Sequence, residues 1–149
     1  ISNSICFSVD GTAMYFCDSM KKAIYRWDDY HGGDASKVRV FAVLDPGPGA
    51  ADGATIDAHD HLWSAQWGAG KVLRFAPDGS IERAVTLPVS QPSCVSLGGA
   101  AFDELFITTA QESLAPAQLA AEPLAGGLFH ARQPGVRGLP EVRFGALPA

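Results

Sequence analysis

Short apolar runs recur along this chain in a fixed order. Each run ends at a turn rich in Gly, Pro or Asp, and the 16 glycines and 10 prolines are spread over the whole length. Short apolar runs bounded by such turns favour β-strands over helices. Residues 111–124 contain two prolines and are expected to form a loop with a turn of helix. The chain is therefore predicted to be all-β.

The order of the runs repeats three times. Aromatic residues at equivalent places, Tyr15, Trp63 and Phe106, stand 48 and 43 residues apart. The first unit has runs at 4–8, 13–17, 23–27 and 37–41, the second at 53–57, 61–65, 71–75 and 81–87, and the third at 93–97, 104–108 and 126–130, with a last strand expected near 141–144.

A second series of residues supports the same period. Ile24, Val72 and Leu128 stand 48 and 56 residues apart, and the 111–124 loop widens the second gap. Four strands in about 40 to 50 residues is the period of a β-propeller blade. A meandering sandwich has similar strands but does not naturally repeat one four-strand order. We therefore predict about three four-stranded blades, over residues 1–50, 51–90 and 91–149.

Three blades do not close a propeller ring. Such rings contain about four to eight blades, and their closure hides the edges of the sheets. The chain is therefore expected to need a partner, either another segment of propeller or a second copy of itself.

Composition excludes several other partners. The formal net charge of -5 argues against binding to a phosphate backbone, and no apolar run is long enough to span a bilayer. The three cysteines, Cys6, Cys17 and Cys94, lie in apolar surroundings without a CxxC pair. They are interpreted as buried thiols in a reducing compartment, which predicts a cytoplasmic protein. The net charge and the lack of a long apolar run predict that the protein has no nucleic-acid or membrane partner.

Candidate chemistry lies where the chain leads into the first strand of each unit, at the expected mouth of the channel. Asn3 and Asp52 occupy equivalent places in the first two units, in Ser2-Asn3-Ser4 and Ala51-Asp52-Gly53. Their oxygens are ligands that suit Ca²⁺ or Mg²⁺, and Zn²⁺ or Mn²⁺ in an open geometry. Asn-Ser and Asp-Gly are also ordinary turn dipeptides, so spacing alone leaves a structural role open.

The other polar candidates are interpreted as structural. Asp10 and Asp78 precede glycines in hairpin turns, and Asp57 follows a strand where a carboxylate caps a turn. The four histidines show no metal-ligand spacing. Trp67 is expected to pack between blades rather than to stack on a sugar.

Six stretches, taken in order, carry a family resemblance: ISNSICFS at 1–8, MYFCDS at 14–19, ADGATIDA at 51–58, LWSAQWG at 62–68, LPVSQPSC at 87–94 and AGGLF at 125–129. Over essentially the whole chain, they resemble the SMP-30/gluconolactonase/luciferin-regenerating family. The resemblance implies a six-bladed propeller of which this chain, residues 1–149, is the C-terminal half.

The resemblance also implies a site with one divalent cation. In the family the ion is held by a Glu near the N-terminus, an Asn and an Asp, and the last two fall on Asn3 and Asp52. Ser4 stands where the family has Gly, and Ala51 where it has Pro. The Glu, and the Arg and Asn that bind substrate hydroxyls, have no counterpart in this chain.

The implied activity is hydrolysis of a sugar lactone such as gluconolactone. The cation, whether calcium, zinc, manganese or magnesium, polarises the lactone carbonyl, and Asp52 is both a metal ligand and the candidate general base. The missing Glu implies that the isolated chain is inactive. The alternative is a half-propeller that serves as a binding or assembly module without catalytic activity of its own.

Overall fold

The computed structural model describes residues 1–141 and shows a partial β-propeller. Its strands form three antiparallel sheets, each built from consecutive strands. The first sheet contains β1 (Ser2–Phe7), β2 (Ala13–Asp18), β3 (Ala23–Asp28) and β4 (Val38–Val43); the second contains β5 (Ala50–Ile56), β6 (Leu62–Trp67), β7 (Lys71–Phe75) and β8 (Ile81–Thr86); the third contains β9 (Pro92–Gly98), β10 (Glu104–Thr109) and β11 (Leu128–Arg132).

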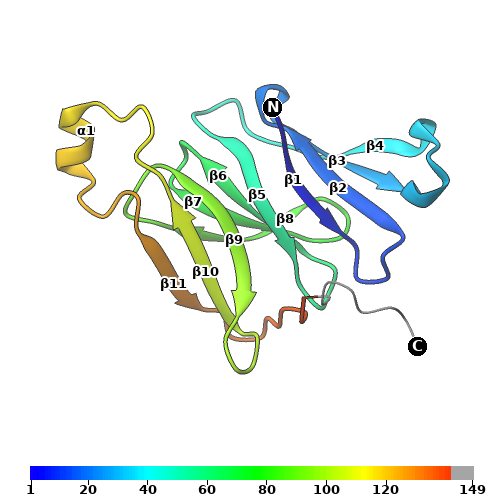
Figure 1. Ribbon diagram of the computed structural model, residues 1–149. Helices are drawn as coiled ribbons and strands as arrows, with labels where there is room; N and C mark the ends of the chain where they lie inside the picture. The colour runs from blue at the N-terminus through cyan, green and yellow to red at the C-terminus, as the bar shows by residue number, and fades with distance from the viewer. Residues whose placement is uncertain (142–149) are drawn as a thin grey trace.

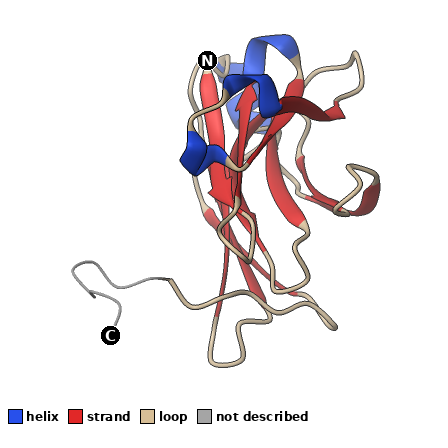
Figure 2. Ribbon diagram, turned by 90° about the vertical axis from the view of Figure 1, so that its right-hand side faces the viewer, coloured by secondary structure: helices blue, strands red, loops and turns tan. Residues whose placement is uncertain are grey.

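The first strands of the sheets, β1, β5 and β9, lie side by side along the middle of the molecule (Figure 1). This arrangement is the one expected for the inner strands of adjacent blades. The helical segments gather at the end of the molecule where residue 1 lies (Figure 2). They include α1 (Pro116–Ala121), which lies within the predicted 111–124 loop. No helix in the part of the chain that the structure describes is long and apolar enough to cross a bilayer.

Two apolar clusters hold the sheets together. The first lies between the β1–β4 and β5–β8 sheets, and the second lies between the β5–β8 and β9–β11 sheets. The middle sheet is therefore covered on both faces, and five consecutive residues of β6 are buried. In β2, by contrast, buried and half-buried residues alternate, because the second sheet covers only one of its faces.

One cross-strand pair recurs in all three sheets. An aromatic residue of the second strand lies directly opposite a basic residue of the third strand, and in the first two sheets the aromatic side chain is buried against the following sheet. The pairs are Tyr15 with Arg26, Trp63 with Arg74, and Phe106 with His130. The predicted aromatic series is thus confirmed by strand register, and we call these the aromatic–basic pairs.

The third sheet differs in two ways from the sequence-based expectation. Its described part has three strands, and the fourth strand expected near residues 141–144 falls mostly outside the described residues; Glu141 itself is not in a strand. Cys94 of β9 is exposed and Cys6 of β1 is only half-buried, whereas all three cysteines were expected to be buried. The reason is that Cys94 points to the face of the third sheet that no other described sheet covers. The limits assigned to the three blades, and the single domain over residues 1–149, stay predictions.

Candidate metal and lactone site

The structure brings Asn3 and Asp52 together. Asn3 lies on β1 and Asp52 on the adjacent β5, both near the start of the strand and at the end of the sheets where residue 1 lies (Figure 1). The sequence placed both residues in loops before the strands, and this was wrong, because β1 begins at Ser2 and β5 at Ala50.

A β-bulge in each of the two strands explains how Asn3 and Asp52 can lie within strands and still direct their side chains toward each other. Pairing with the second strand shifts register between Asn3 and Cys6 in β1, and between Ala51 and Ala54 in β5. Ser4 has a φ of 56° within the first bulge. Bulges bend a strand and change the direction of its side chains, so equivalent bulges in two neighbouring strands direct Asn3 and Asp52 toward each other.

Hydrogen bonds tie the two strands at this point. The Asn3 Nδ2 donates to Asp52 Oδ1, and the Ser4 hydroxyl donates to the Asp52 carbonyl oxygen. The backbone N–H of Ser4 donates to Asn3 Oδ1 over 3.0 Å. The amide of Asn3 is therefore held at both of its ends, and one oxygen of Asp52 remains without a described side-chain partner.

The electrostatics at Asp52 favour proton acceptance. Asp52 is half-buried, and this burial raises the pKa of its carboxyl group above the ordinary value, although hydrogen bonds from Asn3 and the Gly53 N–H act in the opposite direction. Within residues 1–141 no basic side chain forms an ion pair with Asp52.

The third inner strand approaches the site from the other side. A Cβ atom added at Gly53 would lie 2.7 Å from Cβ and 2.8 Å from Cα of Cys94 on β9. Real Cβ atoms do not approach other atoms so closely, so only glycine fits where β5 meets β9. Sequence reasoning did not single out Cys94 for the site, and no motif in the chain marks it.

The oxygen donors fit part of a hard-cation site. Asn3 and Asp52 supply amide and carboxylate oxygens, which Ca²⁺ and Mg²⁺ prefer, but Ca²⁺ takes about six to eight such ligands. No group of three or more His, Cys, Asp or Glu side chains is placed to hold a metal among the described residues. A complete site for such an ion would therefore need further oxygen ligands in addition to Asn3 and Asp52.

Asp57 is a fully buried carboxylate, and it has a structural role. It accepts hydrogen bonds from the Trp63 Nε1 at 2.9 Å and from the Arg74 Nε at 2.8 Å, and also from the backbone N–H groups of His59 and His61. The turn-capping role predicted for Asp57 is confirmed, but its contacts with Trp63 and Arg74 were missed. A signal was present, because Trp63 and Arg74 form an aromatic–basic pair.

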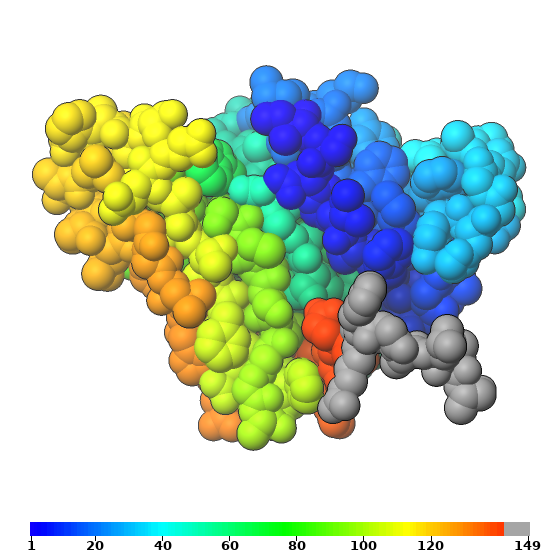
Figure 3. All heavy atoms as spheres, viewed as in Figure 1, coloured from blue at the N-terminus to red at the C-terminus, as the bar shows by residue number. Residues whose placement is uncertain are grey.

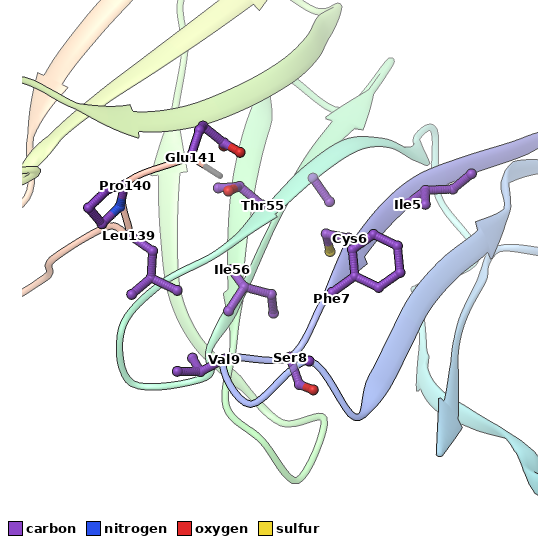
Figure 4. Close-up of a pocket in the computed structure, with 12 residues that line it drawn as sticks. Ile5, Cys6, Phe7, Ser8, Val9, Thr55, Ile56, Leu139, Pro140 and Glu141 are labelled. Atoms are coloured by element: carbon purple, nitrogen blue, oxygen red, sulfur yellow. The ribbon is translucent and has the colours of Figure 1, made fainter. Parts of the chain in front are cut away.

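A cavity of about 470 Å³ lies at the opposite end of β1 and β5 (Figure 4). Phe7 and Ile56 contribute to a mostly apolar lining, together with the Cys6 thiol. A sugar lactone carries several hydroxyl groups and needs more hydrogen-bonding partners than this lining offers. The Asn3–Asp52 end is therefore the better candidate site. Figure 3 shows that atoms of β1, β5 and β9, the strands that carry or flank this candidate site, lie on the surface of the described structure.

Comparisons with known proteins identify the family of the chain. Residues 1–111 match the family model described as the SMP-30/Gluconolactonase/LRE-like region. The chain is 43% identical over 148 residues to L-arabinolactonase of Azospirillum brasilense, covering 99% of this chain and 48% of that protein. It is 35% identical over 135 residues to 6-deoxy-6-sulfogluconolactonase of Pseudomonas putida, covering 89% of this chain and 46% of that protein.

Solved structures give the same result. The calcium-binding protein regucalcin from Agrobacterium tumefaciens superposes with a TM-score of 0.84 at 35% identity, covering 93% of this chain and 48% of that one. A luciferin-regenerating enzyme superposes with a TM-score of 0.79 at 27% identity, covering 93% and 47%. The chain thus spans about half the length of the relatives it matches, and it belongs to the SMP-30/gluconolactonase/LRE-like family.

Proposed function

We propose that this chain forms part of a divalent-metal-dependent sugar-lactone hydrolase. The observation that carries the proposal is the contact between Asn3 and Asp52, two residues whose side-chain oxygens can bind a cation, at the same end of adjacent inner strands. The names of two relatives, L-arabinolactonase and 6-deoxy-6-sulfogluconolactonase, support a sugar lactone as the substrate.

Asp52 is proposed to be the catalytic residue and a metal ligand. Its raised pKa makes it a stronger base than an exposed carboxylate. In the reaction a water molecule attacks the lactone carbonyl carbon and gives one proton to Asp52. Asp52 then returns this proton to the ring oxygen as the ring C–O bond breaks, which yields the hydroxy acid. Asn3 holds the Asp52 carboxylate in position through its Nδ2.

Asn3 and Asp52 are also proposed to hold the cation, whether calcium, magnesium, manganese or zinc. When bound, a divalent cation polarises a carbonyl and stabilises the negative charge that develops on its oxygen. Calcium is the ion named for the A. tumefaciens relative. We expect the remaining ligands to come from the missing half of a longer protein or from a second copy of the chain. The three free thiols fit a cytoplasmic location.

A chimera tests this function. The N-terminal half of the A. brasilense L-arabinolactonase would be joined to residues 1–149, and hydrolysis of L-arabinolactone followed by acid release with each of the four cations. We expect metal-dependent turnover, a loss of about 100-fold or more in kcat for Asp52→Asn, and weaker metal binding by calorimetry for Asn3→Ala.

Asp78→Asn is the matched control, because Asp78 is an exposed carboxylate whose hydrogen bonds among the described residues come from Ser80 in the same turn. An Asp52→Asn chimera with the kcat of the parent would refute the catalytic role. A chimera that folds and binds metal but hydrolyses no lactone would favour the alternative, a binding or assembly module.

A further inference from the structure

The candidate site has an equivalent position on the third inner strand. In each sheet, one residue of the inner strand lies opposite the aromatic member of the aromatic–basic pair. These residues are Cys6, opposite Tyr15; Thr55, opposite Trp63; and Ser96, opposite Phe106. Three residues before them along the chain stand Asn3, Asp52 and Ser93. By strand register, Ser93 of β9 is therefore the counterpart of the two residues that form the candidate site.

A bulge accompanies this position in the third strand as well. In β9, Cys94 pairs with Thr108, and the register shifts before the next pair toward the start of the strand. Ser93 is the extra residue at this shift, and Asp52 lies in the corresponding bulge of β5. Because a bulge turns a side chain out of the regular alternation of a strand, all three inner strands carry the same device at the same place.

The packing of β5 against β9 brings Ser93 beside Asp52. A Cβ atom added at Gly53 would lie 2.7 Å from Cβ of Cys94, so the two strands are in contact at this point. Asp52 precedes Gly53 and Ser93 precedes Cys94, and both strands begin at the end where residue 1 lies (Figure 1). Asn3, Asp52 and Ser93 therefore follow one another across the three inner strands, and all three are half-buried.

The Ser93 hydroxyl is held in place by a neighbouring strand. Its Oγ lies 2.9 Å from Thr108 Oγ1 on β10, and one of these two hydroxyls donates to the other. A serine hydroxyl has one donor and two acceptor sites, so Ser93 keeps the capacity for a further hydrogen bond. A neutral, oriented hydroxyl suits a hydroxyl group of a ligand, whereas hard cations are bound chiefly by carboxylate and carbonyl oxygens.

We propose that Ser93 binds a hydroxyl group of the sugar-lactone substrate, an inference that rests on the proposed function. With the lactone carbonyl at Asp52, the hydroxyl groups of the sugar extend toward the neighbouring inner strands, and β9 supplies Ser93 there. Thr108 orients the Ser93 hydroxyl for this contact. Ser93 is a substrate-binding residue and takes no part in the proton transfers at Asp52.

Ser93→Ala in the chimera with the N-terminal half of the A. brasilense enzyme tests this role. The KM for L-arabinolactone is expected to rise about fivefold with kcat little changed, because a single neutral hydrogen bond changes binding by about three- to tenfold. The Kd of the hydroxy acid product, measured by calorimetry without turnover, is expected to rise equally. Ser96→Ala is the matched control, because it removes an exposed hydroxyl from the same strand. The two halves mixed as separate chains replace the chimera if the fusion does not fold.

Lactones that lack one hydroxyl group separate a direct contact from a structural role. The parent chimera and its Ser93→Ala variant would be compared on the set of singly deoxygenated L-arabinolactones. We expect one analogue to bind the parent about fivefold more weakly than the full substrate, with no further loss of its binding in Ser93→Ala. A Ser93→Ala variant that binds every analogue more weakly by the same factor would overturn the proposal.

The remaining outcomes distinguish this proposal from the proposed function. If Ser93→Ala leaves KM and Kd unchanged in a chimera whose turnover depends on Asp52, the substrate-binding role is wrong and the lactonase proposal stands. If Ser93→Ala weakens metal binding as Asn3→Ala is expected to, Ser93 is a ligand of the cation instead. A folded chimera that neither hydrolyses the lactone nor binds its hydroxy acid would overturn both proposals.

Discussion

Replacement of Asp57 by asparagine is expected to lower the free energy of unfolding by about 3 kcal/mol. The Asp57 side chain is fully buried, with Oδ2 facing Trp63 and Arg74 and Oδ1 facing two backbone N–H groups. An asparagine has only one oxygen, so either orientation turns its NH₂ toward N–H donors and leaves Arg74 without its buried counter-charge. Loss of such a partner costs about 3–5 kcal/mol, and the lower end applies because Glu82 still pairs with Arg74 at 2.7 Å.

Urea unfolding followed by tryptophan fluorescence measures this loss, with Asp78→Asn as the exposed control. Burial acts to raise the pKa of Asp57, but hydrogen bonds from Trp63 and Arg74 outweigh it and the net pKa is lowered. The contribution of Asp57 is therefore complete above the unfolded-state pKa of about 4 and disappears as the pH falls through the lower folded-state value. The difference between wild type and Asp57→Asn should shrink below about pH 4. A loss under about 1 kcal/mol at pH 7 would refute the reasoning.

Three further substitutions or modifications test the geometry around the candidate site. Ser4→Gly should be more stable than Ser4→Ala by about 1 kcal/mol in urea unfolding, because both lose the hydroxyl but only alanine retains the cost of a positive φ. Equal stabilities would contradict the bulge geometry. Gly53→Ala should destabilise the chain by about 1–3 kcal/mol through its clash with Cys94, and a neutral effect would show that β9 lies farther away. Iodoacetamide at pH 8 should modify Cys94 first by mass spectrometry, since burial and Asp60 raise the pKa of Cys6 to about 12.

The repeat could be read from the sequence because strand register preserves it. Tyr15, Trp63 and Phe106 were predicted to be equivalent from their spacing alone, and each occupies the same cross-strand position beside a basic residue. Spacing within a blade is fixed by the pairing of strands. For this reason the aromatic and aliphatic series both fall on the face of each sheet that carries the aromatic–basic pair, even though a loop lengthens the third unit.

The details of the candidate site could not be read in the same way. Asn3 and Asp52 were assigned to loops because Asn-Ser and Asp-Gly favour turns, yet both lie in strands at bulges. The bulge in β1 depends on Ser4 at a positive φ, a conformation that sequence rules assign to glycine. The exposure of Cys94 was missed for a different reason: the apolar residues near it, Val95 and Leu97, lie on the opposite, buried face of the sheet.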